Sequence, residues 1–258
     1  SGGAVGVTKA GVGTMVLSGT NTFGGTGTLS AGTLVLGNIA ALGAATNAVA
    51  LNGGTLDLMT DASVNAYNVT VGGASTISSD RATSGAGITH TLGTLSIGAF
   101  TLSINAGSNV TSGIAGVTFG TTTLTAAAIF NVSSSNANLT LGAVGGAFGM
   151  TKQGTGTMTL ATTSTRVTAA GTTTLTAGTL RLNIANALNT LATAPLTLTG
   201  GTLSLGVTLG ATYGGTATTV NGAATVESDL LTTGAGVTQT LGTLSIGAFT
   251  LSINAGSN

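Results

Sequence analysis

The sequence contains almost no charge. Five Lys and Arg residues and five Asp and Glu residues occur among 258, which is 4% of the chain. An average globular domain carries about 25% charged residues. The formal net charge is zero and the basic residues do not cluster, so the electrostatic surface that nucleic acid or anionic lipid requires is missing. We expect no nucleic-acid partner.

Cysteine and tryptophan are absent, aromatic residues make up 3%, and there is one proline. Without cysteine the chain forms neither disulfides nor thiolate metal sites, so the redox compartment is unconstrained. A carbohydrate groove lined by aromatic residues is hard to assemble from so few. No apolar run approaches the roughly 18 residues that a membrane-spanning helix needs, and the first residues lack the features of a signal peptide. We expect no transmembrane segment in this chain.

The chain is instead rich in glycine, with 44 residues, and it repeats itself. The string LGTLSIGAFTLSINAGSN occurs at residues 92–109 and, unchanged, at 241–258, an offset of 149 residues. The similarity extends upstream of both copies, with small insertions. We therefore predict a first unit at 1–109, incomplete at its N-terminal side, and a second unit at 110–258, in one continuous solenoid.

A shorter period runs inside each unit. Gly-Thr followed by Leu or Met recurs with gaps of 19, 22 and 39 residues in the first unit, so the step is roughly 20 residues. Segments such as GTLVLG alternate apolar and polar residues as half-buried strands do, whereas helix-forming Glu, Lys, Gln and Arg are scarce. Units of this length bury their apolar faces by stacking. The pattern predicts an all-β fold, a single-stranded parallel β-helix of about 12 coils. Its apolar columns are expected to contain Leu34, Leu56, Leu95, Leu180, Leu203 and Leu244.

An ordered set of short motifs occupies residues 9–58. KAGVGTMVL is followed by SGTNTF, AGTLVLG and GGTL. This order resembles the autotransporter-associated β-strand repeat of bacterial passenger proteins. The motif returns as TKQGTGTMTL and LATTSTR, with Arg166 where the first copy has Phe23. The resemblance implies the passenger part of a large secreted or surface-displayed bacterial protein.

The few ionisable residues offer little for catalysis. His90 is the single histidine and has a glutamine at the matching place in the second unit, so we expect a solvent-facing or turn residue. Asp80 matches Asp229 by the 149-residue offset, but its neighbour Arg81 matches a leucine. We expect solvated ion pairs in turns or loops at these places, including Glu227 beside Asp229. We predict no catalytic, cofactor-binding or metal-binding residue.

Three weaker patterns have ordinary explanations. Asp57 and Asp61 would need several more oxygen ligands to bind Ca²⁺. Asn-x-Ser/Thr triplets, which mark glycosylation sites in secreted proteins, arise by chance in such a sequence. They lie at Asn68, Asn109, Asn131 and Asn138. Thr-x-Thr triplets suggest ice binding only if they keep one phase in every coil, and the uneven gaps are expected to break that phase. They occur at 26–28, 121–123 and 172–174.

We predict a structural, non-catalytic segment of an extracellular or surface-displayed bacterial protein that forms a stalk, a fibre or an adhesive layer. The alternatives are a carbohydrate-binding or carbohydrate-cleaving β-helix and, as a minor one, an ice-binding solenoid. Expected partners are neighbouring copies, end to end or side by side, and cell-surface or matrix glycans. Because the string that ends at Asn258 runs on into further residues in the first unit, the array is expected to continue.

Overall fold

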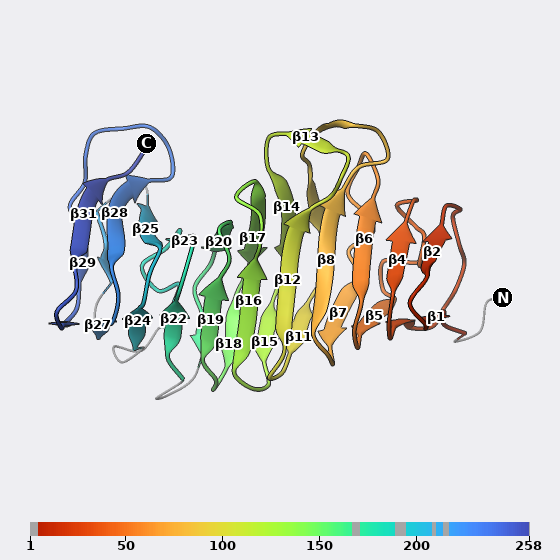
Figure 1. Ribbon diagram of the computed structural model, residues 1–258, viewed down its shortest axis with the longest axis horizontal. Helices are drawn as coiled ribbons and strands as arrows, with labels where there is room; N and C mark the ends of the chain where they lie inside the picture. The colour runs from red at the N-terminus through yellow and green to blue at the C-terminus, as the bar shows by residue number, and fades with distance from the viewer. Residues whose placement is uncertain (1–4, 167–170, 189–194, 208–209, 214–216, 258) are drawn as a thin grey trace.

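The alternation of apolar and polar residues produces a parallel β-solenoid. The computed structural model describes residues 5–166, 171–188, 195–207, 210–213 and 217–257. Within them the chain winds through about 10 turns of roughly 23 residues and forms no helix, so none is long and apolar enough to cross a membrane. Figure 1 shows the turns stacked side by side along the long axis of the molecule. The predicted fold is confirmed.

Three long sheets form the sides of the solenoid, and we number them in the order in which the chain visits them. The first sheet contains β1 (Thr8–Lys9), β3 (Gly27–Leu29), β5 (Ala48–Leu51), β7 (Asn68–Val71), β11 (Leu95–Ile97), β15 (Thr122–Leu124), β18 (Val144–Gly146) and β21 (Thr165–Arg166). The second contains β2 (Thr14–Leu17), β4 (Thr33–Leu36), β6 (Thr55–Met59), β8 (Ser75–Asp80), β12 (Thr101–Ala106), β16 (Ala128–Val132), β19 (Met150–Gln153), β22 (Thr173–Leu175), β24 (Leu196–Leu198), β27 (Thr218–Val220) and β30 (Leu244–Ile246). The third contains β10 (Thr89–Thr91), β14 (Ala115–Phe119), β17 (Ala137–Leu141), β20 (Thr157–Leu160), β23 (Thr179–Leu182), β25 (Thr202–Val207), β28 (Ala224–Leu230) and β31 (Leu251–Ala255). Two short pairs complete the fold, β9 (Gly85–Ala86) with β13 (Val110–Ser112), and β26 (Thr212–Tyr213) with β29 (Thr240–Leu241).

Turn length varies because a corner of the solenoid takes up inserted residues. Thr14 pairs with Thr33, 19 residues later, whereas Ser103 pairs with Asn131, 28 residues later. The added residues leave the strands of the second sheet in register and form projecting loops, as around β9 and β13. The mean turn is therefore nearer 23 residues than the 20 that the Gly-Thr-Leu spacing indicates.

The interior is filled by columns of aliphatic side chains. Leu34 stacks on Leu56 in the second sheet, and Leu180 stacks on Leu203 in the third. All four are buried, as is Leu95 in the first sheet. Leu244 was also predicted to be in the core, but 55% of its surface is exposed. Its strand β30 pairs with β27 alone among the described strands, so no further turn covers it.

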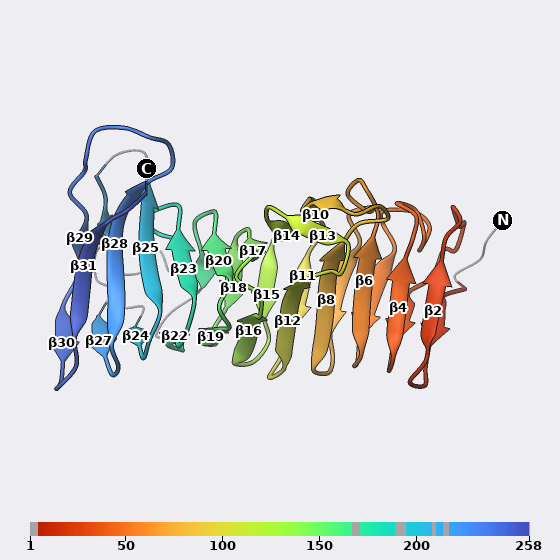
Figure 2. The same cartoon turned by 45° about the horizontal axis from the view of Figure 1, so that its top comes forward.

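The 149-residue sequence repeat does not correspond to a whole number of solenoid turns, so matching strands of the two units lie on different sides of the solenoid. The strand β8 lies in the second sheet, but its counterpart β28 lies in the third, six turns and one side later. The same displacement separates β12 from β31. Because stacked strands twist steadily, the sheets have rotated by then. Figures 1 and 2 show the loops that follow β8 and β28 projecting from the same side of the rod.

Candidate functional site: buried charges that join the turns

Lys9 and Lys152 are the only lysines in the sequence, and both are buried. Lys9 lies on β1, and its Nζ donates hydrogen bonds to the carbonyl oxygens of Ala10 at 3.0 Å, Gly11 at 2.6 Å and Ala31 at 3.0 Å. The first two carbonyls belong to the turn that follows β1, and the third belongs to the next coil. The ammonium group therefore ties one coil to the next.

Lys152 repeats this arrangement on β19. Its Nζ donates to the carbonyl oxygens of Gln153 at 3.0 Å, Gly154 at 2.8 Å and Ala177 at 3.0 Å. We call each lysine with its three carbonyl oxygens a lysine cage. In the described part of the chain neither lysine forms an ion pair. Burial lowers the pKa of Lys152 to about 8, and the three accepting carbonyls oppose that shift because they favour the protonated amine.

A glycine closes each lysine cage from the next coil. Gly32 has a φ of 72°, and a Cβ there would lie 2.4 Å from the carbonyl oxygen of Gly11 and 2.6 Å from Nζ of Lys9. Gly178 has a φ of 65°, and a Cβ there would lie 2.3 Å from the carbonyl oxygen of Gly154. A larger residue would be strained and would displace the cage. This explains why Ala-Gly-Thr follows Lys-x-Gly in both copies.

Two aspartates join coils at the projecting corner. Asp80 ends β8 and is buried, and its Oδ1 accepts hydrogen bonds from the backbone N–H groups of Arg81 at 2.8 Å and Asn109 at 2.9 Å. A Cβ on Gly107 would lie 2.1 Å from the Cβ of Asp80. The turn after β12 therefore sits directly on the carboxylate of the preceding coil, and glycine is required for that approach.

The second unit preserves this corner. Asp229 is buried, accepts a hydrogen bond from the N–H of Leu230 at 2.9 Å, and faces Gly256, where a Cβ would lie 2.4 Å away. It gains an ion pair, because Nη1 of Arg181 reaches its Oδ2 at 2.5 Å across two coils. The repeated Asn-Ala-Gly-Ser thus completes a corner on the aspartate of the previous coil. Asn258 lies outside the described residues.

The expectation of solvated ion pairs fails for both aspartates. Arg81 does not pair with Asp80; its Nε lies 3.0 Å from Oδ1 of Asp61 on the surface. Hydrogen bonds from Thr83, together with Arg81, lower the pKa of Asp61. Glu227 lies half-buried on β28. Asp80 is held by a backbone N–H of the next coil, and Asp229 by Arg181 from two coils away; sequence spacing alone does not show either partner.

His90 is fully buried, contrary to the predicted solvent-facing position. It begins an inward column of the third sheet, where it stacks on Val117. Its Nε2 lies 3.1 Å from the backbone oxygen of Asp80, and Nδ1 has no partner among the described residues. Burial lowers the pKa of His90. The ring is therefore neutral, with Nε2 as the donor, and it reaches no solvent-exposed site.

Arg166 stands where the first copy has Phe23; Phe23 is only half-buried, whereas Arg166 places its guanidinium in the interior. It is buried and donates to Thr173 Oγ1 and the carbonyl oxygen of Phe148, both at 2.8 Å, and to the carbonyl oxygen of Gly171. Burial lowers the pKa of Arg166. Like the lysines, this cation donates to uncharged oxygens of adjacent segments, although its buried Nε has no partner in the described structure.

Asp57 is the one carboxylate with a strongly raised pKa. Burial, and to a lesser extent the charge of Asp80, raise the pKa of Asp57 to about 6. Its Oδ1 is buried without a hydrogen-bond partner in the described structure. Asp61 pairs with Arg81 instead of approaching Asp57 as a co-ligand. Across the described ranges, no group of three or more His, Asp or Glu residues is placed to hold a metal ion.

The asparagine triplets lie on or beside strands. Asn68 is exposed, yet its Oδ1 already accepts a hydrogen bond from the N–H of Thr94. Asn109 donates to the carbonyl oxygen of Arg81 at 2.6 Å. Asn131 and Asn138 are half-buried on β16 and β17.

The threonine triplets keep their phase better than the gaps indicate. Thr28 and Thr123 fall in one outward column of the first sheet, because the loops absorb the differences in turn length. Ala50 interrupts that column, and Thr174 lies in the second sheet. The triplets therefore do not keep one phase in every coil, as expected, but the cause is the residues between them and the change of side rather than the uneven gaps.

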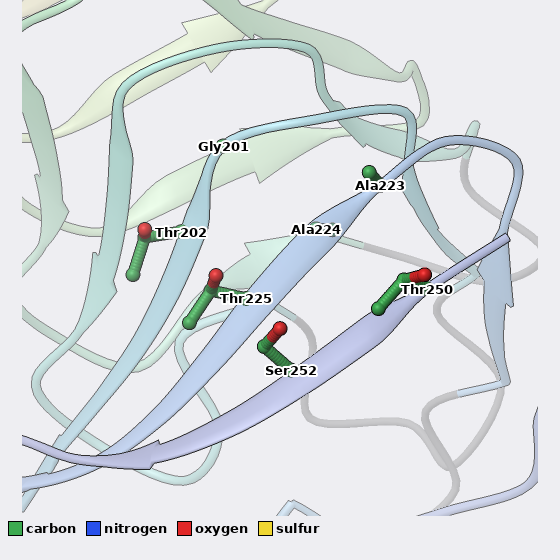
Figure 3. Close-up of a pocket in the computed structure, with 7 residues that line it drawn as sticks. All are labelled: Gly201, Thr202, Ala223, Ala224, Thr225, Thr250 and Ser252. Atoms are coloured by element: carbon green, nitrogen blue, oxygen red, sulfur yellow. The ribbon is translucent and has the colours of Figure 1, made fainter.

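A shallow hollow of about 310 Å³ lies on the outer face of β25, β28 and β31. Thr202, Thr225 and Ser252 stack in register across it, and Figure 3 shows their hydroxyl groups along one row. Gly201, Ala223, Ala224 and Thr250 complete the lining. The hollow offers hydroxyl groups and no ionisable group, so it can contact a neutral polar molecule but has no acid or base.

The lysine cages were missed from sequence, although a signal was present. The only two lysines of the chain stand at the same place in the two motif copies. Residues 7–36 and 150–182 match the passenger-associated-transport-repeat family. Each matched segment contains one complete lysine cage. Comparisons with curated proteins and with solved structures find no match. Together with the solenoid, the two matched segments fit an autotransporter passenger repeat protein.

Proposed function

We propose that the chain is a non-catalytic structural segment, a rigid spacer within the stalk of a passenger that is displayed on a bacterial surface or secreted. The observation that carries the proposal is that the buried charged side chains form hydrogen bonds and ion pairs within the solenoid. Lys9, Lys152 and Asp80 bond to the backbone of an adjacent coil, and Asp229 is held by the N–H of Leu230 and by the side chain of Arg181 from two coils away. Catalytic groups must instead face a substrate.

The outer surface supports the same role. A column of small polar residues runs along the third sheet from Thr157 through Thr179, Thr202 and Thr225 to Ser252. Hydroxyl groups solvate the rod without placing like charges directly over one another in successive coils. They also suit contact with neutral glycans, which supports an adhesive surface more than a cleaving one.

Measuring the height of a displayed reporter tests the spacer role. We would insert the chain between a surface anchor and a fluorescent protein and locate the reporter above the membrane by axial super-resolution imaging. Ten coils at about 4.8 Å each should raise the reporter by about 48 Å along the rod axis, with a narrow distribution. A flexible linker of 258 residues would give a broad distribution around 90 Å, about 5–6 Å times the square root of its length.

The matched control is the Gly32→Val, Gly178→Val double variant, which obstructs both lysine cages. This variant has the same number of residues and nearly the same composition as the wild-type chain, but the reporter should no longer stand at a defined height above the membrane. A reporter height that is the same in wild type and variant would contradict the proposal. So would glycan cleavage by the purified chain that disappears in Asp80→Asn.

A further inference from the structure

The two lysine cages share a geometry that suits one kind of ligand. In each, three carbonyl oxygens lie 2.6–3.0 Å from a single nitrogen. An ammonium group carries three N–H donors on one atom, so it can satisfy all three acceptors at once. A guanidinium spreads its donors over a planar fork and cannot converge in this way.

The environment requires a cation as well as a donor. Burying a charge is costly unless other groups replace its hydration. No carboxylate does so here, because neither lysine forms an ion pair in the part of the chain that the structure describes. The carbonyl dipoles of two successive coils therefore supply the compensation. The same three carbonyls, left without a cation, would be buried acceptors that repel one another.

We infer that each lysine cage is a specific binding site for a primary ammonium ion, built by the Lys-x-Gly turn of one coil and the Ala-Gly-Thr turn of the next, with the lysine as its tethered ligand. The site goes beyond the spacer role, since it predicts that a free alkylammonium ion can replace the lysine side chain. The glycines Gly32 and Gly178 leave room for the nitrogen, as a Cβ at either would enter the cage.

Chemical rescue tests the inference. Lys152→Ala should lower the melting temperature and leave a channel shaped like the missing side chain. Adding n-propylammonium, which has the three carbons and the nitrogen that Lys152→Ala removes, should restore at least half of the lost melting temperature and should saturate, as binding to the folded state requires. 1-Propanol, which has the same shape without the charge, and tetramethylammonium, which has no N–H donor, should restore less than a tenth.

Two variants sharpen the test. Lys152→Met fills the channel without charge, so it should be destabilised and should not respond to n-propylammonium. Lys9→Ala provides the second cage at the N-terminal coil. If Lys152→Ala does not fold, the rescue is followed there by amide hydrogen exchange of β1 and β3. A Met variant as stable as wild type, or equal rescue by 1-propanol and n-propylammonium, would overturn the inference.

Nitrogen NMR of the unmodified protein gives an independent measurement. The chain has two lysines, so ¹⁵Nζ-labelled protein should give two ammonium signals at neutral pH whose protons exchange slowly with water. Fast exchange at both, as in solvent-exposed lysine, would refute the cages. A neutral-amine shift at Lys152 would refute the requirement for a cation.

Discussion

Replacing Ile104 and Ile253 by alanine places the same substitution in the same 18-residue string in two different environments. Ile104 is 0% exposed on β12, which pairs with β8 on one side and β16 on the other. Ile253 is 68% exposed on β31, which pairs with β28. Removing a buried isoleucine side chain costs about 2–5 kcal/mol, whereas an exposed substitution usually stays within about 0.5 kcal/mol.

We therefore expect Ile104→Ala to lower the free energy of unfolding by about 3 kcal/mol and Ile253→Ala by less than about 0.5 kcal/mol. Solenoids can unfold in parts, so urea denaturation should be combined with amide hydrogen exchange of β12 and β31. Ser103→Ala and Ser252→Ala, the adjacent outward positions, serve as controls and should change little. Equal losses at the two isoleucines would refute the assignment of their environments and show that the last coil is covered in solution.

Three further outcomes follow from single side chains. Because the pKa of Asp57 is raised to about 6, its protonated carboxyl stabilises the fold below pH 4, and this contribution is lost as the pH rises through 6. The contribution is worth roughly 1 kcal/mol after solvent screening. Asp57→Asn should abolish this pH dependence in melting curves recorded from pH 4 to 7. Gly107→Ala should cost about 3 kcal/mol in urea denaturation because its Cβ meets Asp80, whereas Gly98→Ala, with ordinary contacts, should cost less than about 1 kcal/mol; equal costs would show that the corner can relax. Trypsin should cut first after Arg81, in the projecting loop, and not after the caged Lys152, with intact mass spectrometry as the readout; early cleavage after Lys152 would contradict the cage.

Most of the architecture was predictable from the repeat. Period-two alternation in short Gly-Thr-Leu segments specified strands, and a step too short to bury its own apolar face specified stacking. The columns through Leu34 and Leu180 followed from that periodicity. The number of residues per coil was underestimated, because loops at one corner add residues that no strand pattern reveals.

The buried charges were not predictable in the same way. Lys9 meets the carbonyl of Ala31, 22 residues away, and Asp80 meets the N–H of Asn109, 29 residues away. Such partners are set by which backbone groups the next coil brings overhead. The position of His90 in the core likewise depends on where the third sheet begins.

The sequence by itself determined the strand period, the stacking, the family motif and the lack of a charged surface, since these depend on local alternation and composition. Only the tertiary structure decided which side of the rod each repeated strand occupies and which charges are enclosed. The physical reason is that one 149-residue repeat unit takes the chain through six turns and one further side of the solenoid, while the sheets twist. Identical strings such as those at 92–109 and 241–258 therefore lie in different sheets, and burial depends on the coil that covers them.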